Sequence, residues 1–127
     1  MANATGKEVG IHTHNNMQLA FANTIEAIIQ GANRIDATML GLGRGAGNCP
    51  MELLLGFLKN PKFNLRPVFK LLQDHLIPMR RTKEWGALIP YVVTGLLNQH
   101  PRAAMRVRAT EEKNQFLEFY DACTSEA

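Results

Sequence analysis

Between Glu8 and Lys59 the sequence alternates between strand-like and helix-like segments. The short stretch Glu8–Thr13 (EVGIHT) has β-branched character and is too brief for a helix, so it predicts a buried strand. Residues Met17–Gln30 carry apolar side chains at three- and four-residue steps, and Gly31 follows them. This spacing predicts an amphipathic helix that ends at the glycine.

A second strand and a second helix follow. Residues Arg34–Leu40 (RIDATML) predict a strand, and Gly41–Asn48 (GLGRGAGN) predicts a glycine-rich loop. Pro50 suits the first turn of a helix that runs to about Lys59, and Glu52 lies near its positive end. The order strand, helix, strand, loop, helix is typical of a parallel βαβ unit, so we expect an α/β fold.

After Asn60–Pro61 the pattern becomes helical. The expected segments are a helix at Leu65–Ile77 ended by Pro78, a less regular apolar stretch at Glu84–Gln99, a helix opened by Pro101, and a last helix that begins near Thr110. We therefore divide the chain into a βαβα part, residues 1–60, and a helical extension, residues 61–127.

Composition narrows the class of protein. The 127 residues are 46% hydrophobic and 20% charged, which is typical of one globular domain. The net charge of +3 is not gathered into a basic block, so no nucleic-acid partner is expected. No segment has the length or hydropathy of a membrane span, and Cys49 and Cys123 form no CxxC motif. The expectation is a soluble cytoplasmic protein without a disulfide framework.

Two histidines stand at the end of the first predicted strand. Residues two apart in a strand point to the same face, so His12 and His14 should project side by side while Thr13 faces away. Two neighbouring imidazoles make half of a divalent metal site, which oxygen ligands would complete. The alternative is that both rings are simply packed or solvated.

The glycine loop allows more than one interpretation. Gly41, Gly43 and Ala46 fit the G-x-G-x-x-G/A pattern of dinucleotide sites, but the acidic residue expected about 20 residues later is absent. The loop still offers backbone amides at a helix N-terminus, which could hold a carboxylate or phosphate. It could also be a tight turn without a ligand.

Taken together, GIHTHNN and FANTIEAIIQGANRIDATMLGLGRGAGNCPMELLL resemble the C-terminal part of the DRE-TIM metallolyases, the superfamily of hydroxymethylglutaryl-CoA lyase. The resemblance covers about residues 9–58, and GAGNCPMELLL looks most like the 4-hydroxy-2-oxovalerate aldolase branch. It implies that the chain forms the last two βα units of a TIM (β/α)8 barrel, followed by a helical C-terminal extension. Both histidines and the glycine loop would then lie at the carboxyl face, where such barrels keep their active sites.

The resemblance also implies roles for individual residues. His12 and His14 would be metal ligands, with Asn48 at or near the metal, while Asn16, Gly43 and Gly45 would shape the substrate site. The implied cofactor is a divalent ion, Mn²⁺ or Mg²⁺, with Zn²⁺ as an alternative. Tyr91 is a further substrate-side candidate by the same resemblance; the alternative is that Tyr91 and Trp85 are core or interface residues.

The implied reaction is cleavage or formation of a carbon–carbon bond in a 4-hydroxy-2-oxo acid through a metal-stabilised pyruvate enolate. The family's Asp and Arg motif on the first barrel strand has no counterpart here, so the chain is expected to be a fragment that is inactive alone. One rival is an acyl-CoA condensing enzyme of the isopropylmalate or homocitrate synthase kind. Another is a non-catalytic helical interaction module formed by the residues after Pro61.

The expected partners follow from the same resemblance. They are a small 2-oxo-acid substrate and an acyl-aldehyde dehydrogenase, which the aldolase branch binds through its added helices. Two strands alone leave open hydrogen-bonding edges and an uncovered apolar face. We therefore also expect a homo-oligomer, or association with the missing half of the barrel.

Overall fold

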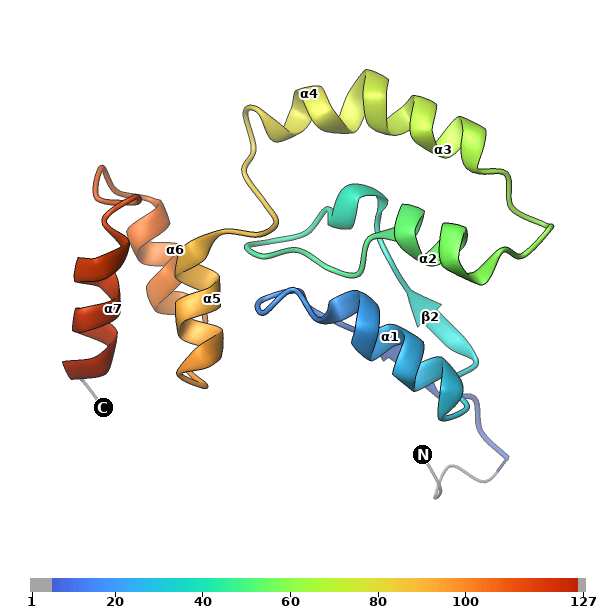
Figure 1. Cartoon of the computed structure of the whole chain (residues 1–127), viewed down its shortest axis with the longest axis horizontal. Coiled ribbons are helices and arrows are strands. Elements are labelled where there is room, and N and C mark those ends of the chain that lie inside the picture. Colours follow the sequence, from blue (N-terminus) through green and yellow to red (C-terminus); the bar gives the residue numbers. More distant parts are fainter. Residues whose placement is uncertain (1–5, 126–127) are drawn as a thin grey trace.

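The computed structural model describes residues 6–125 and has an α/β architecture (Figure 1). Two parallel strands, β1 (Gly10–His12) and β2 (Arg34–Asp36), are connected through helix α1 (Ala20–Ile29). The α/β class and the parallel βαβ order are therefore confirmed. The paired strands are shorter than predicted, because hydrogen-bonded pairing extends only from the Gly10–Arg34 pair to the His12–Asp36 pair.

Helix α1 begins later than the predicted Met17. The chain first makes a turn in which Gln18 has a φ of 59°, a left-handed conformation that a helix cannot include. The side-chain oxygen of Asn15 then accepts a hydrogen bond from the backbone N–H of Ala20 at 3.1 Å. An asparagine before the helix therefore satisfies one of its free amide groups.

The segment after β2 does not continue as a strand to Leu40. It forms a short 3₁₀ turn, η1 (Met39–Gly41), within which Leu40 has a φ of 54°. Helix α2 (Met51–Leu58) follows the loop, and Pro50 immediately precedes it. A buried cluster joins α1, β2 and α2; its members are Ala20, Cys49 and Leu54, with Phe21, Ile25, Ile28, Ile35 and Ala37 packed against them.

Helix α3 (Leu65–Leu71), a π-helical turn η2 (Leu72–Leu76) and helix α4 (Ile77–Arg80) follow one another without a break (Figure 1). The prediction that Pro78 ends this helix is wrong. After the π turn the proline lies in the first turn of α4, where its missing N–H is tolerated.

A second cluster crosses the proposed boundary at residue 60. Its buried members are Val68, Leu72, Leu76 and Trp85, and Met39, Leu40 and Leu55 of the front half pack against them. The division of the chain at residue 60 stays a prediction.

The remaining helices are α5 (Ile89–Leu96), α6 (Arg102–Arg108) and α7 (Phe116–Ser125), which lie together at the left of Figure 1. The apolar stretch predicted to be irregular thus contains a helix, because Pro90 occupies its first turn. The last helix begins at Phe116 instead of near Thr110. The side chain of Thr110 instead accepts a hydrogen bond from the N–H of Glu112 within a turn.

None of the helices within residues 6–125 combines the length and the apolar character needed to cross a membrane.

Candidate functional site

The two histidines lie beside each other at the end of β1. Their ring centroids are 5.0 Å apart and the rings are inclined by 71°. The hydroxyl of Thr13, between them, turns toward α1 and donates a hydrogen bond to the carbonyl of Ala20 at 3.0 Å. The alternation predicted from the strand is therefore confirmed, with both imidazoles on the face away from the helix.

Each imidazole has a polar partner at its Nδ1 atom. Nδ1 of His12 lies 3.1 Å from a carboxylate oxygen of Asp36, the residue paired with it across the sheet. Nδ1 of His14 lies 3.1 Å from the side-chain oxygen of Asn48, at a bridge between the two segments. Because Nδ1 is engaged in both rings, Nε2 is the nitrogen left for a ligand.

The glycine loop holds Asn48 in this position. The side-chain amide nitrogen of Asn48 donates a hydrogen bond to the carbonyl of Leu42 at 3.2 Å. A Cβ on Gly43 would lie 2.6 Å from that nitrogen, closer than real Cβ contacts allow. Gly43 therefore contributes by leaving room for the Asn48 amide, and we find no direct contact of Gly43 with the histidines in the described residues.

Gly45 brings the helical extension against the loop. It has a φ of 65°, and a Cβ there would lie 2.9 Å from Cε1 of Tyr91. Only 5% of Tyr91 is exposed, and this burial raises the pKa of the phenol, with a smaller opposing effect from the charge of Arg44. The N–H of Gly86 also donates to the carbonyl of Gly45 at 3.1 Å. From the front half, the N–H of Asn15 donates to the carbonyl of Gly47 at 2.9 Å, so both halves of the chain hold the loop.

The two histidines, the glycine loop and Tyr91 surround a pocket of about 370 Å³, within the size range of small-molecule sites. Six of the seven predicted site residues line it: His12, His14, Asn16, Gly45, Asn48 and Tyr91. The seventh, Gly43, lies behind Asn48. Tyr91 therefore belongs both to the buried cluster with Ala46 and Ala104 and to the pocket wall, whereas Trp85 is a core residue.

Three residues at this site were missed by the sequence reasoning. Asp36 contacts His12, and Arg44 and His100 line the pocket. The register of two parallel strands that end together could have indicated Asp36. No sequence signal indicated His100, because it reaches the pocket only through the packing of α5 and α6.

The described residues supply a partial metal site at most. Among residues 6–125 no group of three or more histidine, cysteine, aspartate or glutamate side chains is arranged to hold a metal ion. The two free Nε2 atoms form a pair of donors.

Comparison with known proteins identifies the family of the chain. The sequence model of the HMGL-like family matches residues 2–73. The 4-hydroxy-2-oxovalerate aldolase of Thermus thermophilus is 50% identical over 68 residues, which are 51% of this chain and 19% of that protein. The oxaloacetate decarboxylase of Mycobacterium tuberculosis is 50% identical over 56 residues, 44% of this chain and 17% of that protein.

A solved structure is also similar. The N-terminal domain of a candidate aldolase from Bacteroides vulgatus superposes with a TM-score of 0.69 at 37% identity, over 84% of this chain and 36% of that chain. The matched stretch therefore spans about a fifth of the two curated relatives and about a third of the solved structure. The family match covers more than half of the sequence, and the chain belongs to the HMGL-like family.

Proposed function

We propose that this chain supplies two metal ligands and one wall of the substrate pocket to an aldolase that cleaves or forms a carbon–carbon bond in a 4-hydroxy-2-oxo acid. The observation that carries the proposal is the pair of adjacent imidazoles, each with Nδ1 engaged and Nε2 free. The printed names of relatives supply the reaction class, since several are 4-hydroxy-2-oxovalerate aldolases.

The residues present fit a divalent ion. Histidine ligands in metalloproteins usually donate their second ring nitrogen to a carboxylate or an amide oxygen, which orients the ring. Asp36 and Asn48 occupy these positions toward His12 and His14. In this arrangement Asn48 orients His14, and its direct contact with the ion stays a prediction. Mn²⁺ or Mg²⁺ is proposed as the ion, with Zn²⁺ as the alternative.

The ion and the residues of the chain would have different functions in the reaction. A bound divalent ion would supply Lewis-acid stabilisation for the negative charge that develops on the 2-oxo group as the carbon–carbon bond breaks. Asn16 and Tyr91 line the pocket on the side of the extension. Because Gly45 has no side chain, the tyrosine ring can lie close to the loop. These residues would orient the substrate and restrict its access to water.

The helical extension takes part in this proposed site. Tyr91 on α5 and His100 beyond its end both line the pocket with the histidines of the front half. A helical extension that served only to bind a partner protein would not need to place Tyr91 and His100 in the pocket of the two histidines. We therefore favour the aldolase proposal over the purely non-catalytic one.

The full activity is proposed for an assembly larger than this chain. We propose that β1 and β2 are the last two strands of a TIM barrel, whose other strands supply the Asp ligand and the catalytic Arg. The limited coverage of the relatives supports this view, because about four fifths of their length has no counterpart in the matched stretch. The substrate is proposed to be a 2-oxo acid; oxaloacetate, named for one relative, is an acid of this class.

The test is calorimetric titration of Mn²⁺ into the purified chain and into two variants. We expect measurable binding in the wild type, and its loss in the His12→Ala, His14→Ala double variant, because both proposed donors are removed. His75→Ala is the matched control, since His75 is exposed on the π turn, and it should bind like the wild type. Absence of Mn²⁺ binding in a folded wild-type chain, shown by circular dichroism, would contradict the proposal.

A further inference from the structure

The pocket lining has an uneven charge. It includes three histidines and one arginine, His12, His14, His100 and Arg44, together with the side-chain amides of Asn16 and Asn48. No aspartate or glutamate is among the residues that line it. The nearest carboxylate named at this site, that of Asp36, is not part of the lining and lies 3.1 Å from Nδ1 of His12. A lining rich in hydrogen-bond donors favours an anionic ligand.

Arg44 is the permanent positive charge of this pocket. It lies in the middle of the glycine loop, between Gly43 and Gly45, and its charge acts on the phenol of Tyr91. In the described part of the chain Arg44 forms no ion pair; this is also true of several surface arginines, and Arg44 differs from them in lining this pocket. A guanidinium left without an internal counter-ion at a pocket wall is suited to hold a carboxylate of the ligand.

His100 lies at the same pocket from the other half of the chain. Its Nδ1 atom accepts a hydrogen bond from the backbone N–H of Arg102 at 3.2 Å. In the neutral ring this places the hydrogen on Nε2, which becomes a donor. Arg44 and His100 therefore present donors from two separate segments, the glycine loop and the turn between α5 and α6.

We propose that Arg44 and His100 form a subsite for a second, distal carboxylate, so that the ligands of this pocket are dicarboxylic 2-oxo acids. The assignment of the 2-oxo end to the two histidines rests on the proposed function. The distal subsite itself depends only on Arg44 and His100 and does not require a metal. The two oxygens of one carboxylate can accept from the two kinds of donor, and a pocket of about 370 Å³ has room for an acid of about five carbons.

The test compares two acids of equal chain length, 2-oxoglutarate and 2-oxopentanoate, which differ only in the distal carboxylate. Binding to the full chain is measured by calorimetry, once with Mn²⁺ and once with a chelator. We expect 2-oxoglutarate to bind about tenfold or more tightly than 2-oxopentanoate in both series, as charge-assisted hydrogen bonds of this kind allow.

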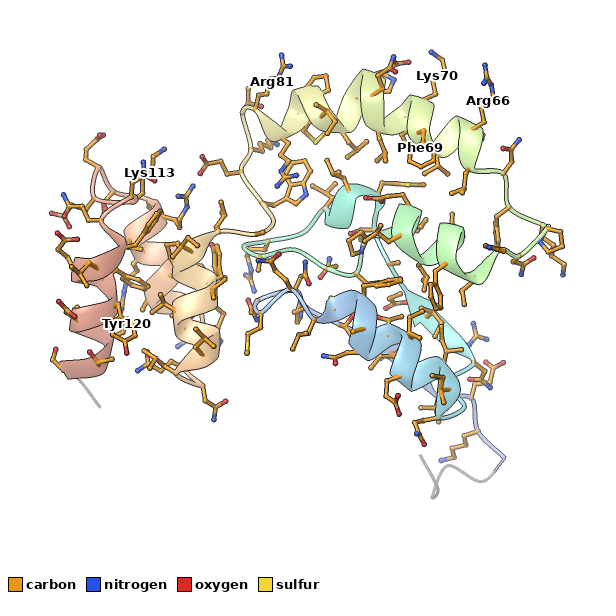
Figure 2. The ribbon with its side chains drawn as sticks, in the orientation of Figure 1. Arg66, Phe69, Lys70, Arg81, Lys113 and Tyr120 are labelled. Atoms are coloured by element: carbon orange, nitrogen blue, oxygen red, sulfur yellow. The ribbon has the colours of Figure 1, made fainter. Side chains whose placement is uncertain are left out.

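Two variants test the residues. Arg44→Gln should remove most of the preference for 2-oxoglutarate while it leaves the affinity for 2-oxopentanoate within about twofold, and His100→Ala should reduce the preference by a smaller factor. Arg66→Gln is the control: it removes an arginine that projects outward from the start of α3, outside this pocket (Figure 2), and should keep the preference.

The outcomes separate this inference from the proposed function. A preference that persists with the chelator but without any Mn²⁺ binding would support the dicarboxylate subsite and contradict the metal proposal. Equal binding of the two acids to the wild type, or an unchanged preference in Arg44→Gln, would overturn the subsite even if Mn²⁺ binds. Failure of 2-oxoglutarate to bind the folded chain in both series would overturn it as well.

Discussion

Asp36 fixes the ring of His12 from the neighbouring strand. It is the last residue of β2, and the parallel register places it directly beside His12 at the end of β1. The resulting contact of 3.1 Å joins two largely exposed side chains, so it contributes little to the stability of the fold. The proposed function of this contact is to orient the imidazole of His12 toward a metal ion.

We predict that Asp36→Asn weakens Mn²⁺ binding by about tenfold, because the neutral amide makes His12 a less basic ligand. Calorimetric titration measures the change, and urea unfolding of the same variant should show little loss of stability. Asp74→Asn provides the control, since Asp74 pairs with Lys70 on the exposed side of the helical rod formed by α3, η2 and α4. Equal Mn²⁺ affinity in Asp36→Asn and the wild type would show that the contact does not tune the site.

At the scale of elements, Trp85 connects the helical rod to the front half of the chain. Only 2% of it is exposed, and it packs with Val68, Leu72 and Leu76 from α3 and the π turn. Its indole N–H donates a hydrogen bond to the carbonyl of Leu40 in η1 at 2.9 Å. Trp85, which lies between α4 and α5, is therefore anchored to η1 at the start of the glycine loop that shapes the pocket.

We predict that Trp85→Phe lowers the free energy of unfolding by about 1–3 kcal/mol, because the Leu40 carbonyl loses its donor and the smaller ring leaves a gap. Urea unfolding followed by circular dichroism measures this loss. Phe69→Leu is the comparison, since 56% of Phe69 is exposed, and it should change stability by less than about 0.5 kcal/mol. Similar losses in the two variants would mean that Trp85 does not anchor the rod.

At the scale of the whole molecule, the two-stranded sheet has no further strand paired to it within residues 6–125, so one edge of each strand is open there. Beside it lies a hollow of about 970 Å³ whose lining includes Ile35, Leu54, Leu58 and Phe63. Large apolar side chains are also exposed nearby, with Leu53 at 52% and Phe63 at 57%. Open strand edges and grouped apolar residues favour association with another polypeptide.

We predict that the isolated chain self-associates in a concentration-dependent way, which sedimentation velocity measures. A Leu53→Glu, Phe63→Glu double variant should sediment as a smaller species, because charges are placed on the exposed apolar surface. Leu117→Glu is the matched control, since Leu117 is 68% exposed on α7 and lies away from the strands. A wild-type chain that stays monomeric over the whole concentration range would contradict the prediction.

The sequence by itself determined the features that depend on local order. The alternation of β-branched and amphipathic segments gave the βαβ unit, because residue periodicity follows directly from strand and helix geometry. The same alternation placed His12 and His14 on one face and Thr13 on the other. The glycine loop was recognised from composition, although the function of Gly43 in accommodating Asn48 was not.

Only the tertiary structure decided the features that depend on contacts between distant residues. Strand register brought Asp36 to His12, and helix packing brought His100 to a pocket formed around residues 12–16 and 44–48. The π turn also placed Pro78 in the first turn of α4, a position that propensity alone could not foresee. These arrangements arise from packing and pairing over long sequence separations, and local residue patterns carry no direct record of such contacts.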